Sequence, residues 1–225
     1  MRYEPNVKGG SYEKVLAEFL KTYVAGILDF HTRAQLMDAK LEYINVFKVG
    51  ENSFDVVGTF KNSIPKLVFD IEDTSFVCLD TVALILEVKQ DLTKSNLIGD
   101  LEKFGKLCKL SLSPDRYGPS ITGQYTIKEP FKCLFYFDSS IDKQVLIESL
   151  FTYQEYWHML VVLNKCELYC NPSVKFTGQV SGETQPFYTN NYVLSQMLVI
   201  LANSLPFPLV VNNSRLFLNM FDAAR

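Results

Sequence analysis

The chain has 225 residues, of which 48% are hydrophobic and 21% charged, a composition that excludes intrinsic disorder, collagen-like sequence and a small disulfide-framed domain. Its length predicts a single domain over residues 1–225. Lys and Arg number 22 against 25 Asp and Glu, and the net charge of −3 disfavours constitutive tight binding to nucleic acid.

Cysteine and histidine usage excludes the common metal motifs. The cysteine count is 5, an odd number, and no pair has the CxxC spacing, so we expect a reducing, cytoplasmic location. His31 and His158 lie too far apart for an HExxH zinc helix. The sequence contains neither a GxxxxGK phosphate loop nor a GxGxxG dinucleotide fingerprint, and its first residues lack the apolar run of a signal peptide.

The first half of the chain predicts one helix followed by strands. We expect a helix over about 12–24, with Ser11 as its N-cap. Two strands are predicted over 41–49 and 52–60, on either side of a turn at Gly50-Glu51. A short apolar stretch over 67–69 follows a loop.

The middle of the chain predicts a strand, a helix and a second strand. The apolar run over 82–89 is typical of a strand buried on both faces. A helix over about 95–110 and a strand over 132–138 complete a right-handed parallel crossover. The helix is expected to bury Leu97, Leu101, Phe104 and Cys108 and to direct Lys103, Lys106 and Lys109 outward.

The last part predicts a helix over 141–157, a hairpin over 159–170, a helix over 187–203 and a strand over 208–211. Residues 193–211 carry no charge, but their Pro, Asn and Ser residues favour a buried helix and strand over a membrane span. The predicted fold class is α/β, with a central mixed sheet flanked by helices.

Charged residues end the most apolar strand, at Glu87-Val88-Lys89. Side chains alternate across a strand, so Glu87 and Lys89 share one face. A carboxylate and an ammonium are costly to bury there unless they pair or bind something. The spacing alone is weak evidence, because a structural ion pair at a strand end has the same pattern.

Asp55 interrupts a second buried-looking strand. If the two strands pair, Asp55 and Glu87 can face one cation. Two carboxylates and a backbone carbonyl, that of Val88, suit Mg²⁺, which prefers oxygen ligands and keeps several waters. Lys89 would then lie beside a metal-bound water and stabilise charge on a phosphoryl oxygen.

Glu13 is the third acidic candidate. On a helical wheel it lies inside the apolar arc, whereas Glu18 lies on the opposite, solvated side. The arc contains Val15, Leu16, Ala17, Phe19, Leu20, Tyr23 and Val24. An inward carboxylate could complete a metal site or hold its waters; a first-turn carboxylate favoured by the helix dipole is the alternative.

In this order, helix Glu, strand Asp and strand Glu-x-Lys, the sequence resembles the PD-(D/E)XK nuclease superfamily. More narrowly, it is similar to the NucC type of endonuclease from bacterial cyclic-oligonucleotide anti-phage signalling and to the uncharacterised domain family around it. The similar stretches include residues 8–13, 53–57, 86–90 and 191–211. Residues 25–40, which include Arg33, are longer than the corresponding segment of that family.

The resemblance implies a restriction-endonuclease-like core and Mg²⁺-dependent (or Mn²⁺-dependent) cleavage of double-stranded DNA. Asp55, Glu87 and Lys89 would be the catalytic set with Glu13 as the helix carboxylate, and Asp55, Glu87 and Val88 would hold the metal. It also implies homotrimers that bind a cyclic oligoadenylate and pair into hexamers.

Two other functions remain open from the residues. The first is an autonomous restriction or repair nuclease, in which Lys94, Lys103 and Lys106 follow the phosphates of the nucleic acid. The second is a non-catalytic interaction or ligand-binding module that keeps the fold, because a fold does not determine a function.

Overall fold

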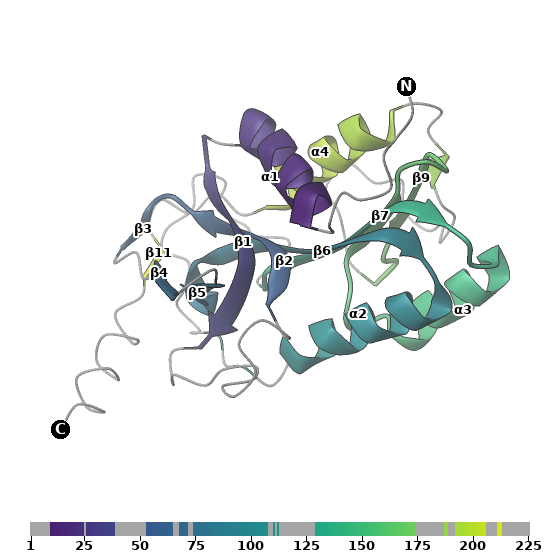
Figure 1. Cartoon of the computed structure of the whole chain (residues 1–225), viewed down its shortest axis with the longest axis horizontal. Helices are drawn as coiled ribbons and strands as arrows, with labels where there is room; N and C mark the ends of the chain where they lie inside the picture. The colour runs from purple at the N-terminus through teal and green to yellow at the C-terminus, as the bar shows by residue number, and fades with distance from the viewer. Residues whose placement is uncertain are drawn as a thin grey trace.

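A mixed β-sheet with helices on both faces organises the chain (Figure 1). The computed structural model describes residues 10–24, 26–38, 53–64, 68–71, 74–107, 110, 112, 129–173, 187–188, 192–205 and 211–212. Within these ranges the helices are α1 (Gly10–Val24), α2 (Lys94–Leu107), α3 (Lys143–Thr152), α4 (Val193–Ser204) and the short 3₁₀ helix η1 (Leu79–Thr81). The strands are β1 (Leu28–Met37), β2 (Phe54–Phe60), β3 (Ser63–Ile64), β4 (Val68–Ile71), β5 (Thr74–Cys78), β6 (Val82–Leu92), β7 (Phe131–Ser139), β8 (Met159–Val162), β9 (Glu167–Cys170), β10 (Phe187–Tyr188) and β11 (Val211–Asn212).

The described strands form a nine-stranded sheet in the order β10-β9-β8-β7-β6-β2-β1-β5-β4, and β11 pairs with β3 in a separate two-stranded sheet. At the centre, β6 pairs parallel with β7 and antiparallel with β2. The predicted β6-α2-β7 crossover and the β8-β9 hairpin are both confirmed. The fold class is therefore α/β with a mixed sheet, as the sequence predicts.

Each face of the sheet has its own hydrophobic core. Helices α1 and α4 cover one face, and α2 and α3 cover the other (Figure 1). Strand β6 lies between them and is buried from Val82 to Val88, which is why its sequence is an unbroken apolar run as far as Glu87. Burial of β6 ends near Lys89, and the charged candidate residues Glu87 and Lys89 lie at this boundary.

The structure corrects several predicted boundaries. Helix α1 begins at Gly10, so Ser11 lies in its first turn and is not its N-cap. Helix α3 is shorter than predicted, and α4 begins at Val193 because Phe187-Tyr188 forms β10 against β9. The predicted strand over 41–49 lies outside the described residues, and the strand that pairs with β2 is β1, which was not predicted.

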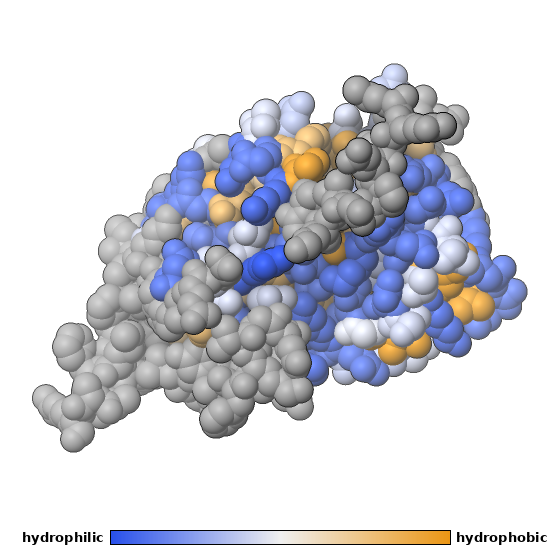
Figure 2. All heavy atoms as spheres, in the orientation of Figure 1, coloured by the Kyte–Doolittle hydropathy of each residue, from blue (hydrophilic) through white to orange (hydrophobic). Residues whose placement is uncertain are grey.

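The predicted apolar arc of α1 is only partly buried. Leu16, Ala17, Leu20 and Val24 enter the core, whereas Val15 and Tyr23 are each 63% exposed. On α4, Tyr192 at its N-cap and Val199 are also exposed. Figure 2 shows hydrophobic side chains gathered over α1 and α4 at the top of the molecule. By the α1/α4 apolar patch we mean the exposed side chains of Val15, Tyr23, Tyr192 and Val199, which belong to the two helices that cover the same face of the sheet.

None of the described helices has both the length and the apolar character required to span a membrane.

Candidate functional site

Strand pairing brings the predicted acidic residues together. The antiparallel register of β2 and β6 places Val56 opposite Leu86, so Asp55 and Glu87 are the next residues at the same level of the sheet. Lys89 follows on the same side as Glu87, as the alternation of strand side chains predicts, and its Nζ lies 3.1 Å from Glu87 Oε2.

The Lys89 ammonium lies among three oxygen atoms. Its Nζ is 2.7 Å from Asp55 Oδ2, 3.1 Å from Glu87 Oε2 and 3.5 Å from the backbone carbonyl oxygen of Val88. Asp55 Oδ2 also accepts a hydrogen bond of 2.8 Å from the Val88 backbone N–H, which fixes the carboxylate against β6. Two carboxylates and one carbonyl thus converge on one cation, in the donor set that suits a hard metal ion.

Glu87 is a buried carboxylate with a cation on each oxygen. Its side chain is 1% exposed, with Oε2 on Lys89 and Oε1 at 2.5 Å from Lys103 Nζ. Burial, followed by the negative charge of Asp55, raises the pKa of Glu87 to about 7, although the two ammonium groups oppose this rise. A carboxylate in this environment binds cations strongly, because it has no water to solvate its charge.

Lys89 is a permanent cation in this arrangement. Burial opposes its charged form, but the carboxylates of Glu87 and Asp55 outweigh burial and raise its pKa above the ordinary value. The side chain is also 35% exposed, so it can reach a bound substrate. A lysine that keeps its proton stabilises developing negative charge and does not act as a general base at neutral pH.

Glu13 points inward as predicted, with 15% of its side chain exposed. Its ion-pair partner is Arg33, at 3.7 Å from Nε to Oε2. Burial and the nearby charge of Asp55 raise the pKa of Glu13. Within the described residues no three His, Cys, Asp or Glu side chains are close enough to share a metal.

Arg33 stands at the edge of the site in an unusual backbone conformation. Thr32 pairs with Val56 and Ala34 with Phe54, which places Arg33 level with Asp55. Its φ is 54°, in the left-handed region that non-glycine residues rarely adopt. Strain of this kind persists where the surrounding structure enforces it, and it is common at functional sites.

Sequence reasoning missed two polar residues of the site. Asp100 of α2 accepts a 2.7 Å hydrogen bond from the Tyr136 hydroxyl, and both side chains are buried. Burial raises the pKa of Asp100, while the charges of Lys89 and Lys103 oppose that rise. The signal was present in the sequence, because Asp100 lies beside Leu101 on the inner side of the predicted helix.

The lysines proposed to follow phosphates separate into two groups. Lys106 is exposed on α2, as predicted, and Lys94 is exposed as well, whereas Lys109 lies outside the described residues. Lys103 is not directed outward: its side chain is 16% exposed, and its Nζ contacts Glu87 Oε1 and the Ser53 carbonyl oxygen. The prediction was wrong because the long side chain curls back from the helix edge toward a buried carboxylate.

A second cluster of buried charge lies away from these carboxylates. Glu129 contacts Lys132 Nζ at 2.9 Å and His158 Nε2 at 3.1 Å, and the Lys132 side chain is only 2% exposed. The Lys132 backbone N–H donates to His158 Nδ1, so the ring proton is on Nε2 and donates to Glu129. Burial opposes the charge of Glu129, but His158 and Lys132 lower its pKa to about 2.

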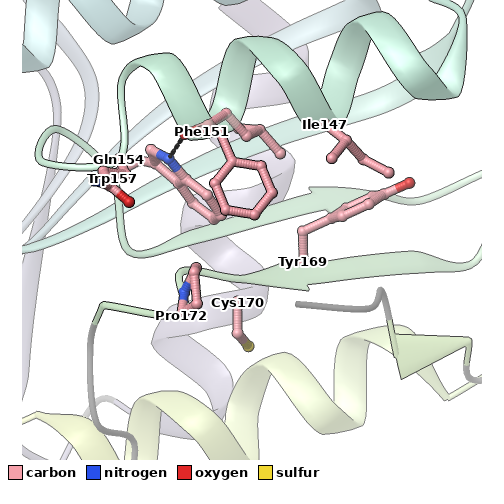
Figure 3. Close-up of a pocket in the computed structure, with 8 residues that line it drawn as sticks. Ile147, Phe151, Gln154, Trp157, Tyr169, Cys170 and Pro172 are labelled. Atoms are coloured by element: carbon pink, nitrogen blue, oxygen red, sulfur yellow. Dashed lines mark hydrogen bonds between the residues drawn. The ribbon is translucent and has the colours of Figure 1, made fainter. Parts of the chain in front are cut away.

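Two small hollows lie among the described residues. The first lies between α3 and β9, where Phe151, Trp157 and Tyr169 line a space of about 20 Å³ (Figure 3). That volume accommodates about one water. The second, of about 90 Å³, lies beside Lys132 among Leu79 and Leu107. Neither of these two hollows is lined by Asp55, Glu87 or Lys89.

Comparison with solved structures identifies the fold. NucC of P. aeruginosa ATCC27853 in its cAAA-bound form aligns over 98% of this chain and 89% of its own, with a TM-score of 0.70 and 16% sequence identity. The chain has the NucC fold. The cAAA-bound NucC of E. coli MS115-1 gives a TM-score of 0.66 at 15% identity over 97% of this chain and 88% of its own.

The apo form of the E. coli NucC aligns with a TM-score of 0.65 at 16% identity over 92% of this chain and 89% of its own. No protein-family profile and no curated protein matches the sequence. The resemblance to NucC drawn from Asp55 and Glu87-Val88-Lys89 is thus confirmed for the fold, while the roles of these residues stay predictions.

Proposed function

We propose that this protein is a metal-dependent endonuclease that cleaves double-stranded DNA. The observation that supports it is the position of the Lys89 ammonium among Asp55 Oδ2, Glu87 Oε2 and the Val88 carbonyl oxygen, within a NucC fold. These oxygens come from adjacent strands of a rigid sheet. A purely structural ion pair needs only one carboxylate, whereas this position collects two carboxylates and a carbonyl.

The same three oxygens would hold Mg²⁺ or Mn²⁺. Both ions prefer oxygen ligands, and Mg²⁺ keeps several waters, which accounts for a site with few protein ligands. When bound, the metal would activate a water and offset charge on the phosphoryl group. Lys89 would then stabilise the negative charge that develops on a phosphoryl oxygen, because its raised pKa keeps it protonated.

Glu13 and Arg33 are proposed as supporting residues at the rim of the site. Glu13 lies near Asp55 but is paired with Arg33, so its role would be to orient water or Arg33 and not to bind the metal directly. Arg33 is 54% exposed and can approach a phosphate. Exposed Lys94 and Lys106 of α2 would add weaker phosphate contacts.

We further propose that a cyclic oligonucleotide activates the protein and that it acts as a cytoplasmic anti-phage effector. Two of the similar structures are NucC in a cAAA-bound form, so cAAA is the first activator to test. Assembly of several copies would provide the DNA affinity that a chain of net charge −3 lacks. The α1/α4 apolar patch is a surface available for such assembly (Figure 2).

The test is plasmid cleavage. The purified protein is incubated with supercoiled plasmid and Mg²⁺, alone or with cAAA and a panel of other cyclic oligonucleotides, beside Glu87→Gln as an isosteric control. We expect cleavage only with one activator and its loss, by at least ~10³-fold, in Glu87→Gln. Cleavage without any nucleotide would instead establish the autonomous nuclease.

A third result would favour the non-catalytic module. If neither plasmid nor RNA is cleaved with any activator, and Mn²⁺ does not bind to the wild-type protein in a titration, the carboxylates serve only as an ion-pair network. Retained cleavage in Glu87→Gln would contradict the assignment of the site itself.

A further inference from the structure

Lys103 is not among the motif residues from which the resemblance was drawn. It comes from α2, sixteen positions after Glu87, and its Nζ lies 2.5 Å from Glu87 Oε1. The same nitrogen donates to the Ser53 carbonyl oxygen at 2.8 Å and lies 4.8 Å from the centre of the Phe54 ring. The Lys103 ammonium is therefore held by the carboxylate of Glu87 on β6, the ring of Phe54 on β2 and the carbonyl of Ser53 just before β2.

These contacts divide the two oxygens of Glu87 between two lysines. Lys103 holds Oε1, and Lys89 holds Oε2. The two lysines differ in how firmly they are held, because Lys103 is 16% exposed and Lys89 is 35% exposed. Lys103 also has a ring beneath it, and Phe54 is stacked on Phe104 of α2.

Of these two lysine positions, that of Lys89 has the oxygen set of a metal site. Lys103 contacts one carboxylate oxygen and one carbonyl, on the side of Glu87 that faces α2. Lys89 contacts both carboxylates and the Val88 carbonyl. A metal that binds Asp55 and Glu87 must displace the Lys89 ammonium, whereas Lys103 can stay in place.

We infer that Lys103 is a positioning residue that holds Oε1 of Glu87 and thereby keeps Oε2 directed at the shared position beside Asp55. This inference deepens the proposed function and rests on it. A carboxylate with one oxygen anchored cannot rotate about its terminal bond, so the ligand geometry is set before the metal arrives. Residues that orient metal ligands in this way typically change metal affinity or activity by about 10–100-fold when they are removed.

A positioning role and a simple charge effect predict opposite results. Lys103 carries a positive charge close to the metal position, so its removal should strengthen metal binding by roughly tenfold or more if only Coulomb repulsion matters. If Lys103 positions Glu87, its removal frees a buried carboxylate and weakens metal binding. Loss of Lys103 also removes a charge that lowers the pKa of Glu87, so the comparison is made at a pH well above that pKa, where Glu87 is ionised. There the sign of the change separates the two roles.

The experiment measures Mn²⁺ affinity by calorimetry and by the paramagnetic signal of free Mn²⁺, without DNA or turnover. The full-length wild-type protein is compared with Lys103→Met, Lys103→Arg and Lys106→Met. Lys106 is exposed on the same helix, so Lys106→Met removes the same charge away from Glu87. If Lys103→Met does not fold, Lys103→Gln takes its place, and its Mn²⁺ affinity is compared with the wild type in the same way.

We expect Mn²⁺ to bind Lys103→Met about 10–100-fold more weakly than the wild type, with Lys103→Arg recovering most of the loss. Lys106→Met should change the affinity by less than about twofold. Unchanged or tighter binding in Lys103→Met overturns the positioning role and leaves the proposed function intact. Absence of Mn²⁺ binding in the wild type overturns the proposed function, and this inference with it.

Discussion

The side-chain nitrogen of Lys89 lies 2.7 Å from Asp55 Oδ2, in the position where Asp55, Glu87 and the Val88 carbonyl converge. The lysine therefore occupies the position that a divalent ion would take. Its ammonium offsets the charge of both carboxylates, because burial and the neighbouring charge of Asp55 disfavour the ionised form of Glu87. In the proposed function, metal binding would therefore be an exchange of one cation for another.

Lys89→Met tests this exchange. Loss of the ammonium removes the competitor for the three oxygens, so Mn²⁺ should bind at least ~10-fold more tightly, while plasmid cleavage is lost. The measurements are Mn²⁺ calorimetry and cleavage with the activator present. The isosteric Asp55→Asn is the matched control and should lose both metal binding and cleavage. Weaker Mn²⁺ binding in Lys89→Met would show that the lysine does not occupy the metal position.

Arg33 offers a test of backbone strain. Its φ of 54° costs an L-residue about 1 kcal/mol relative to glycine, which adopts this conformation freely. Arg33→Gly and Arg33→Ala both remove the guanidinium, so their difference isolates the backbone. Arg33→Gly should be more stable than Arg33→Ala by about 1 kcal/mol in urea unfolding. Equal stabilities would show that the left-handed conformation is not enforced in solution.

Replacing only one partner of the Glu129–Lys132 ion pair should lower the stability of the protein to unfolding. Glu129→Gln leaves the buried Lys132 ammonium without its carboxylate and should lower the free energy of unfolding by about 2 kcal/mol. Breaking a fully buried pair would lower it by more, because Glu129 is half-exposed. The double variant Glu129→Gln with Lys132→Met should recover most of that loss. Urea unfolding at pH 7 measures the stability of the single and the double variant. A double variant no more stable than Glu129→Gln would contradict the proposed effect of the unpaired Lys132 ammonium.

The same ion pair predicts that the folding stability of the protein depends on pH. The pKa of Glu129 is lowered to about 2 in the folded protein, so its stabilising contribution is complete above its unfolded pKa of 4.5. That contribution is lost as the pH falls from 4.5 toward 2. The stability difference between wild type and Glu129→Gln should therefore narrow over this window. A difference that stays constant from pH 5 to pH 3 would show that Glu129 is not held in its charged form.

The α1/α4 apolar patch predicts the behaviour of the assembled protein. Val15 and Tyr23 are exposed, so replacing both with Ser should alter folding stability by less than about 0.5 kcal/mol. If the patch is an assembly face, the mass in light scattering should fall to that of a single chain. Phe151→Ser, on α3 at the other face of the sheet, is the matched control. An unchanged mass in the α1 variant would exclude the patch as the interface.

The periodicity of single elements was enough to predict the central part of the site. The apolar run from Val82 predicts a buried strand, and the alternation of strand side chains puts Glu87 and Lys89 on one face. The helical wheel likewise places Glu13 inward. These predictions are correct because each depends on the period of one element, which local sequence specifies.

Which elements lie next to one another depends on how the whole chain folds. The sequence does not show that β2 pairs with β1, that Arg33 stands level with Asp55, or that Asp100 accepts from Tyr136. Long flexible side chains are the clearest case, because Lys103 is a surface residue by its helical position yet contacts Glu87. Such contacts depend on how a helix packs against a sheet. The periodicity of side chains within the helix or within a strand does not specify this packing.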